Sequence, residues 1–427
     1  MSRSLAEFRR SDPMDAQEPN CRFCGAELSQ VFADLGLSPL CQTQIRTEHL
    51  NQAETFYPLR AFLCSKCFLV QLEDYVSPEI IFNRDYPYFS SYSDSWLKHA
   101  KDYVSKMRTC HGVGPDSFVV EVASNDGYLL QHFVDVGISC LGIEPAENVA
   151  IAARKKGIET ISRFFGKAAA ADIVREYGRA DLLLGNNVLA HVPDLNDFVS
   201  GLREVLADEG FITMEFPHLM RLIEDNQFDT IYHEHFSYFS LSTANKVFAH
   251  HGLTIFDVDE LSTHGGSLRI YAAKSDTGGR SVSSRVMELL KREKSMGFET
   301  VEFYAGFQEK IREVKRALLE FLITAKRQGK TIVGYGAPGK GNTLLNYCGI
   351  RQDFLDYTVD RSPHKQGTYT PGTRIPILNP SVISQTKPDY ILILPWNLRR
   401  EIKDSMSHVV EWGCRFVVPI PCLEILE

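Results

Sequence analysis

The sequence predicts an α/β protein built from three parts: a small N-terminal zinc-binding domain, a Rossmann-like central domain and a smaller C-terminal Rossmann-like domain. Four cysteines form two CxxC pairs near the N-terminus. Two later regions each alternate short apolar runs with helix-length segments, which is typical of parallel α/β sheets. With 427 residues, 44% of them apolar, the chain is long enough for roughly two to four domains.

The composition of the chain excludes several classes of protein. A net charge near −8 and a pI near 5.9 provide no broad attraction to nucleic acid or anionic lipid. Residues 1–20 are polar with mixed charge, and no stretch approaches the roughly 20 apolar residues of a membrane-spanning helix. We therefore expect a cytoplasmic protein that binds neither nucleic acid nor membrane, with a monomer as the working expectation.

The N-terminal cysteines have the spacing of a structural zinc site. Two CxxC pairs allow four thiolates to converge on one tetrahedral ion. The pairs are Cys21 with Cys24, and Cys64 with Cys67. A redox-active CxxC would begin a helix of a thioredoxin-like unit, a pattern that this region lacks. The remaining cysteines have no ligand spacing and are predicted to be small core residues, among them Cys41, Cys110, Cys140 and Cys348.

The first α/β region carries a pattern for cofactor binding. Its predicted strands span 118–123, 140–143, 182–185 and 211–216. The first strand leads through a tight turn into a helix, where backbone N–H groups can bind a ligand. This turn matches the ExGxGxG register of S-adenosylmethionine methyltransferases at Glu121, Ala123, Asn125 and Gly127, with Ala and Asn in place of two glycines.

Two further residues of this region are candidates for the cofactor pocket. Glu144 ends the second strand, where a carboxylate can accept hydrogen bonds from both ribose hydroxyls. Asn187 follows the strand at 182–185, at the same edge of the predicted sheet. The competing interpretations are a plain surface turn at 124–127 and a solvated carboxylate at Glu144.

A cluster of titratable side chains provides a candidate general base. His191 follows the strand at 182–185, and Tyr232, His233, Glu234 and His235 are adjacent in the sequence. A histidine near a carboxylate and a tyrosine is suited to proton abstraction, because its unperturbed pKa lies near neutral pH. A metal site at His233 and His235 is one alternative, and a purely structural role is another.

A helical connector leads to a second glycine loop. Apolar residues from Phe303 to Ala325 recur every three or four positions, which predicts an amphipathic helix that ends at Gly329. Strands are then predicted at 331–335, 357–360, 390–394 and 415–420. The loop after the first of these has the glycine spacing of an NAD fingerprint, but the region supplies only part of a dinucleotide fold. A diphosphate site is the competing interpretation, with the candidate residues Gly336, Gly339, Lys340, Asn342, Asp360 and Lys365.

Several motifs together resemble the S-adenosylmethionine-dependent nucleotide-sugar C-methyltransferases, which are best known for acting on C3 of dTDP-linked 4-keto sugars, although relatives with similar motifs methylate other carbons or other sugars. Besides the CxxC pairs and the turn at 121–127, the motifs are Tyr86-Pro-Tyr-Phe-Ser-Ser-Tyr-Ser93, Tyr232-His-Glu-His-Phe-Ser-Tyr238, His264-Gly-Gly-Ser-Leu-Arg269 and Gly334-Tyr-Gly-Ala-Pro-Gly-Lys-Gly-Asn342. The resemblance covers nearly the whole chain from Cys21. It implies active-site roles for Tyr86, His191, Tyr232, Glu234 and His235.

This resemblance sets the expected function and organisation. We expect methyl transfer from S-adenosylmethionine to a sugar carbon, most simply C3, after His235, oriented by Glu234, removes a proton beside a ketone. Tyr232, Tyr86 or His191 would donate to the enolate oxygen, and zinc would be structural only. An NAD-dependent sugar oxidoreductase or epimerase and a non-catalytic nucleotide-binding module are the alternatives. The expected divisions are a polar tail (1–20), a zinc-binding domain (21–85), a methyltransferase domain (86–280), a helical connector (281–330) and a nucleotide-sugar-binding domain (331–427).

Overall fold

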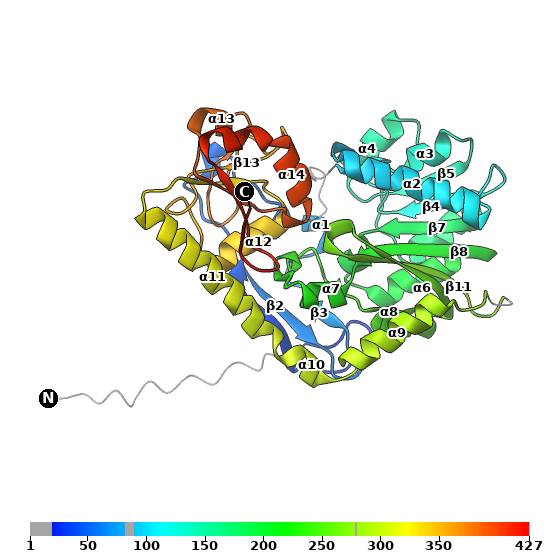
Figure 1. Ribbon diagram of the computed structural model, residues 1–427. Helices are drawn as coiled ribbons and strands as arrows, with labels where there is room; N and C mark the ends of the chain where they lie inside the picture. Colours follow the sequence, from blue (N-terminus) through cyan, green and yellow to red (C-terminus); the bar gives the residue numbers. More distant parts are fainter. Residues whose placement is uncertain (1–18, 82–88, 278–279, 427) are drawn as a thin grey trace.

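The computed structural model describes residues 19–81, 89–277 and 280–426, and these residues form three β-sheets (Figure 1). The mixed α/β class expected from the sequence is confirmed. One continuous apolar core runs through the structure and includes Cys21, Leu189, Phe307 and Leu344, which come from four successive parts of the chain. The three sheets are therefore packed together by shared apolar burial.

The N-terminal sheet is antiparallel and takes its last strand from far along the chain. Its order is β1 (Gln30–Ser38), β2 (Tyr57–Leu63), β3 (Val70–Leu72) and β9 (Ser237–Tyr238). A short helix, α1 (Pro78–Ile81), follows β3. In the register, Val70 lies opposite Tyr238 and Gln71 opposite Ser237. Because β9 directly follows the histidine cluster, the cysteine-bearing sheet holds one end of that cluster in place.

The central sheet has seven strands in the order β10-β11-β8-β7-β4-β5-β6. Its strands are β4 (Phe118–Val122), β5 (Ser139–Ile143), β6 (Thr160–Ile161), β7 (Ala180–Asn186), β8 (Leu206–Pro217), β10 (Leu253–Leu261) and β11 (Ser267–Lys274). Strands β4 to β8 pair in parallel, which confirms the four strands predicted here. Strands β10 and β11 extend the sheet as an antiparallel pair that the sequence did not indicate.

Helices cover this sheet and connect its strands (Figure 1). They are α2 (Asp94–His111), α3 (Leu130–Val134), α4 (Glu147–Lys155), α5 (Lys167–Tyr177), α6 (Leu195–Val205), α7 (Leu219–Glu224) and α8 (Leu241–His250). The strand order reverses between β4 and β7, and open α/β sheets bind ligands outside the carboxyl ends of the strands at such a point. The turn at 123–127 and the residues after β7 lie at this reversal.

The connector consists of three helices, α9 (Ser284–Met296), α10 (Val301–Ala305) and α11 (Phe307–Arg327). The buried side of α11 carries Phe307, Ile311, Val314, Leu318, Leu322 and Ala325, so the predicted amphipathic helix is largely confirmed. Its start was predicted wrongly, because Phe303 lies in α10 and Gly306 separates the two helices. Gly329 follows α11 with a φ of +71°, the left-handed conformation that ends many helices.

The C-terminal sheet has the order β14-β13-β12-β15-β16-β17. Its strands are β12 (Ile332–Tyr335), β13 (Thr358–Val359), β14 (Ile377–Leu378), β15 (Tyr390–Ile393), β16 (Arg415–Val418) and β17 (Glu424–Leu426). Its helices are α12 (Gly339–Cys348), α13 (Val382–Thr386) and α14 (Arg399–Ser405). The four strands predicted here are confirmed. The sheet is parallel up to β16, and its strand order reverses at β12, between β13 and β15.

Candidate active site

The four N-terminal cysteines converge on one point. Their sulfur atoms all lie within 4.8 Å of one another, with 3.6 Å between Cys21 and Cys67 and 3.5 Å between Cys24 and Cys64. Four thiolates at about 2.3 Å from a tetrahedral zinc ion are separated by about 3.8 Å, so the set fits zinc. Gln71 donates from Nε2 to the Cys21 sulfur over 3.2 Å and supports the ligand from β3. These cysteines form the structural zinc site.

The cofactor turn is bent tightly after β4 and is held by Glu144. Ala123, Asn125 and Gly127 have φ values of +58°, +50° and +75°. A Cβ atom on Gly127 would lie 2.2 Å from Ile158 Cδ1, so glycine is required by both conformation and space. The Glu144 carboxylate accepts from the Asn125 N–H at 3.0 Å and from the Ala146 N–H at 2.8 Å. Glu144 therefore fixes the turn, and its two oxygens retain lone pairs for a ribose.

The buried carboxyl groups and the unpaired amide oxygen beside this turn fit S-adenosylmethionine. Glu121 is fully buried beside Glu144, and burial raises the pKa of Glu121 well above its ordinary value. Burial also raises the pKa of Glu144, to about 7. Asn187, with a φ of +54°, has a buried Oδ1 atom without a hydrogen-bond partner among the described residues. The cation and hydroxyl groups of the cofactor are suited to these acceptors.

His235 lies at the centre of the titratable cluster and is held in one tautomer. Its Nδ1 atom donates to the carbonyl oxygen of Thr230 over 2.9 Å, which leaves Nε2 as the acceptor of the neutral ring. The ring centroid of His235 lies 4.0 Å from that of Tyr232 and 4.7 Å from that of His191. Burial, with His191 second, lowers the pKa of His235 well below its ordinary value. His235 is therefore neutral and has the proton-accepting nitrogen of a general base.

The neighbours of His235 face in different directions from those expected. The orienting acceptor at Nδ1 is Thr230, so the prediction that Glu234 fills this role is wrong. Glu234 is buried against Cys41, whose sulfur lies 3.6 Å from Oε1. His233 contacts the Pro58 carbonyl oxygen through Nε2 at 3.1 Å. His233 and His235 therefore do not share a metal position, and the cysteine set is the metal-ligand cluster found among the described residues.

Residues from a neighbouring loop connect the histidine cluster with the cofactor turn. Asn187 donates from Nδ2 to His264 Nε2 over 3.0 Å. The Trp96 ring lies 5.1 Å from the ring of His264 and stacks at 5.8 Å on Tyr128, which follows the turn. The sequence alone indicates no role for His264, although this residue begins the motif at 264–269. The signal that could have found His264 is its place just before β11, beside the strand that ends at Pro217.

The second glycine loop is ordered by its own residues. Gly336 has a φ of +88°, and Asp360 accepts from the Ala337 N–H at 2.8 Å. Lys365 donates to the Ala337 carbonyl oxygen over 2.9 Å. A Cβ atom on Gly339 would lie 2.9 Å from the sulfur of Cys41. Asp360 and Lys365 therefore order the loop through the backbone N–H and carbonyl oxygen of Ala337.

Of the predicted substrate residues, Asn342 lies at a contact between domains and Lys340 at a contact within the C-terminal domain. Asn342 donates from Nδ2 to the Cys41 carbonyl oxygen over 2.7 Å. Lys340 donates to Asn397 Oδ1 over 2.8 Å, and its ammonium lies 4.5 Å from the ring centroid of Trp396. Tyr86 lies outside the described residues. Of the five residues expected in the active site, the structure therefore brings together His191, Tyr232 and His235 and places Glu234 beside them against Cys41.

Family comparisons cover all three domains. Residues 21–82 match a family described as "Putative zinc binding domain", residues 101–258 match a methyltransferase domain and residues 262–421 match a C-methyltransferase C-terminal domain. Over 401 residues the chain is 36% identical to the C-methyltransferase NovU of Streptomyces niveus, which covers 94% of this chain and 95% of that protein. The chain belongs to the S-adenosylmethionine-dependent C-methyltransferases. This membership decides against the NAD-dependent alternative.

Solved methyltransferases show more distant likenesses. Magnesium protoporphyrin IX methyltransferase from Synechocystis, with bound S-adenosylhomocysteine, is 15% identical and has a TM-score of 0.33, covering 42% of this chain and 83% of that one. A methyltransferase of Thermotoga maritima is 19% identical with a TM-score of 0.32, covering 43% of this chain and 94% of that one.

Across residues 19–81, 89–277 and 280–426 of this C-methyltransferase, no helix is long and apolar enough to cross a membrane.

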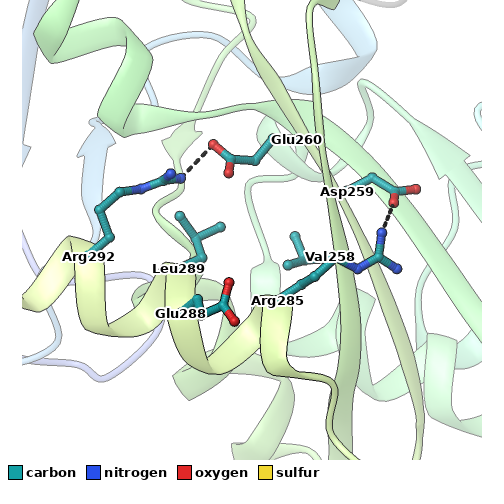
Figure 2. A pocket seen from close by; sticks show the side chains of 7 residues that line it. All are labelled: Val258, Asp259, Glu260, Arg285, Glu288, Leu289 and Arg292. Carbon is teal, nitrogen blue, oxygen red and sulfur yellow. Dashed lines mark hydrogen bonds and ion pairs between the residues drawn. The ribbon is translucent and has the colours of Figure 1, made fainter.

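A surface pocket of about 390 Å³ lies elsewhere on this methyltransferase, between β10 and α9 (Figure 2). Its lining is charged, and Figure 2 shows Arg292 paired with Glu260 and Arg285 paired with Asp259 across it. Because these ions compensate one another, the pocket offers little net charge to a ligand. It shares no residue with the cysteine site, the cofactor turn or the histidine cluster.

Proposed function

We propose that this C-methyltransferase methylates C3 of a nucleotide-linked 4-keto deoxysugar through an enolate that His235 forms. The single observation that carries the proposal is the hydrogen bond from His235 Nδ1 to the Thr230 carbonyl oxygen. It fixes the tautomer in which Nε2 accepts a proton, at the carboxyl edge of the central sheet. The resemblance in the motifs at 232–238 and 334–342 supports the sugar nucleotide as substrate.

The chemistry requires a base and a stabilised enolate. A C–H bond beside a ketone is acidic because the electron pair delocalises onto oxygen when the bond breaks. His235 Nε2 would take this proton, and Tyr232 and His191, whose rings lie next to His235, would donate to the enolate oxygen. The carbanion then forms a bond to the methyl group that S-adenosylmethionine supplies. Positioning of these groups accounts for much of the expected rate.

The division of labour between the domains follows from the two glycine turns. We propose that the methyltransferase domain (86–280) holds the cofactor through Glu121, Ala123, Asn125, Gly127, Glu144 and Asn187. The C-terminal domain (331–427) would hold the nucleotide through the loop that Asp360 and Lys365 order. The zinc-binding domain (21–85) stays outside the chemistry and supports the histidine segment through the β3–β9 pairing.

Product analysis tests this function. Incubation of the protein with S-adenosylmethionine and a panel of dTDP-linked 4-keto deoxysugars should give one product that gains a methyl group by mass spectrometry. Carbon-13 NMR with a labelled methyl donor should place that group on C3. Methylation at oxygen or nitrogen, or of no 4-keto sugar in the panel, would contradict the proposal.

A further inference from the structure

Lys340 lies in the first turn of α12, and its ammonium faces residues that follow β15. It donates to Asn397 Oδ1 over 2.8 Å and lies 4.5 Å from the ring centroid of Trp396. A lysine ammonium has three donors, and Asn397 is its hydrogen-bond acceptor among the described residues. Lys340 is half-buried, and its ammonium retains donor capacity for a ligand.

The N-terminal half of α12 packs directly against the segment that carries His235. Thr343 donates from its hydroxyl to the Ile231 carbonyl oxygen over 3.3 Å. Trp396 donates from Nε1 to Asp229 Oδ2 over 2.8 Å, and the next residue, Thr230, holds His235. The route from Lys340 through Trp396 to His235 thus crosses the contact between the C-terminal and methyltransferase domains.

The other side of Trp396 meets the loop that carries His264. A Cβ atom on Gly265 would lie 2.4 Å from the Trp396 ring, and Gln227 donates to the Gly265 carbonyl oxygen over 2.7 Å. The positive charge of Lys340 also lowers the pKa of His235 and of His264, and it opposes the rise that burial causes in the pKa of Asp229. The ammonium therefore acts on the histidine cluster itself.

We propose that Lys340 is a catalytic residue that donates to the carbonyl oxygen of the substrate and stabilises its enolate. This inference rests on the proposed function. His235 Nε2 takes the proton, the C–H electron pair moves onto the ketone oxygen, and the ammonium pairs with the resulting oxyanion. When the carbon bonds to the methyl group, the pair returns from oxygen and the S–CH₃ electrons remain on sulfur. A cation stabilises an oxyanion more strongly than the neutral donors Tyr232 or histidine can.

This assignment competes with the diphosphate role that the sequence suggested for Lys340. A diphosphate ligand would make Lys340 a determinant of nucleotide affinity. An enolate ligand would make it a determinant of the proton-removal step alone. The two roles predict opposite effects on nucleotide affinity and on solvent exchange.

The experiment uses the full-length protein and measures three quantities. These are the affinity for S-adenosylhomocysteine, the affinity for dTDP, and deuterium incorporation beside the ketone of a saturating dTDP-4-keto deoxysugar in deuterated buffer. For Lys340→Met we expect both affinities within a few fold of wild type and exchange slower by about 10² to 10³-fold, the usual cost of removing one oxyanion donor. Lys387→Met is the matched control, because the Lys387 ammonium lies 6.0 Å from the Trp412 ring in the same domain, away from the histidines.

Chemical rescue separates a lost donor from a damaged fold. Lys340→Ala should regain exchange when propylammonium chloride is added, and sodium chloride should have no such effect. A variant that loses dTDP affinity but exchanges at the wild-type rate when saturated would overturn the inference and restore the diphosphate role. The inference would also be overturned if wild type exchanges and Lys340→Met exchanges at the same rate. If wild type neither exchanges nor methylates any sugar in the panel, the proposed function itself has failed.

Discussion

At the residue scale, the Thr230 carbonyl oxygen determines what His235 can do. A neutral imidazole has one donor and one acceptor nitrogen, and a fixed partner at Nδ1 assigns the acceptor to Nε2. A carboxylate at this position would stabilise the protonated ring and raise its pKa, whereas a carbonyl oxygen does so less strongly. Burial, the largest cause, lowers the pKa of His235, and the Thr230 carbonyl oxygen opposes this shift less than a carboxylate would, so the ring is neutral.

His235→Ala is the most direct test of the base. We expect turnover to fall by about 10² to 10⁴-fold, because positioned general bases contribute this much. The affinity for S-adenosylhomocysteine, measured by calorimetry, should stay within a few fold, since the cofactor turn is built from other residues. His233→Gln is the matched control, because His233 contacts Pro58. Undiminished solvent exchange in His235→Ala would move the base to another residue.

The pH dependence of exchange should follow the lowered pKa of His235. The base must be neutral to accept a proton, so activity is lost only as pH falls through the folded pKa. Because burial, His191, His264 and Lys340 lower this pKa, we expect a constant rate down to about pH 6, below the ordinary histidine value of about 6.5. Burial lowers the pKa values of the neighbouring His191 and His264 to about 4, so both rings remain neutral in this range.

Asp229 requires a control in the same profile. Burial raises its pKa to about 7, and it lies beside Lys340 and Trp396. If the exchange rate falls near pH 7 in wild type but not in Asp229→Asn, this fall reports the protonation of Asp229. An acid limb at or above pH 6.5 that persists in Asp229→Asn would contradict the predicted pKa of the base.

At the element scale, β9 joins the zinc-binding domain to the active site. Ser237 and Tyr238 pair with β3, which follows Cys67 and carries Gln71, and Leu72 donates to the Phe236 carbonyl oxygen over 3.0 Å. Loss of the metal therefore loosens the sheet that positions residues 232–238. We therefore expect the zinc site to affect activity through this strand without taking part in the reaction.

Zinc removal should affect turnover and cofactor binding to different extents. Elemental analysis should find one zinc ion per chain, and Cys64→Ser should lower stability and solubility, because structural zinc contributes folding free energy. Where the metal-depleted protein remains soluble, we expect turnover to fall more than affinity for S-adenosylhomocysteine. Protein purified without chelator that contains no zinc would refute the site.

Helix α9 is anchored by the buried carboxylate of Glu293. Glu293 is completely buried, accepts from His218 Nε2 at 2.8 Å and from the N–H groups of Leu241 and Ser242 at 2.7 Å. Leu241 and Ser242 begin α8, and the first N–H groups of a helix have no acceptor within the helix. Glu293 of the connector therefore caps the N-terminus of α8. His218 is therefore part of the scaffold that holds α9.

Glu293→Gln should be strongly destabilising. The amide weakens the hydrogen bonds that the buried carboxylate accepts and places an NH₂ group opposite some of their donors, and each buried polar group left without a partner costs about 1 to 3 kcal/mol. Glu288→Gln on the same helix is exposed and should change stability by less than about 0.5 kcal/mol. Urea denaturation of both variants gives the comparison, and equal stabilities would show that the Glu293 carboxylate is not an anchor.

At the scale of the whole molecule, one apolar core joins all the domains. Arg374 of the C-terminal domain pairs with Glu54 of the N-terminal domain at 3.1 Å, and Asn226 donates to the Pro421 carbonyl oxygen over 3.1 Å. Truncation near Lys330 would expose the apolar residues that these contacts surround. Point variants therefore test the division of labour better than separated domains.

Lys365→Met should weaken nucleotide binding alone. Lys365 lies on the carbonyl oxygen of Ala337 in the second glycine loop, and a cation there favours a bound diphosphate. We expect the Kd for dTDP to rise about tenfold, which corresponds to a loss of about 1.4 kcal/mol of binding free energy. The Kd for S-adenosylhomocysteine should stay unchanged. Calorimetry with both ligands measures this, and equal dTDP affinity in wild type and variant would refute the nucleotide role of the loop.

The sequence by itself determined the features that depend on local spacing. The cysteine pairs, the parallel strands of two α/β regions and the amphipathic connector follow from residue type and periodicity over short stretches. Glycine positions such as Gly127 and Gly336 also follow from it, because a tight turn after a strand requires left-handed backbone there. The reason is that hydrophobic periodicity and turn chemistry act between residues close in the chain.

Only the tertiary structure decided which way the side chains of the histidine segment and of the second loop face. Thr230 instead of Glu234 holds His235, β9 belongs to the N-terminal sheet, and Lys340 lies against Trp396. Glu234 and His235 are adjacent in an irregular segment whose path is set by contacts with Cys41 and with α12, far away in the sequence. Such long-range packing selects among orientations that are equally compatible with the local sequence, so no spacing rule can assign them.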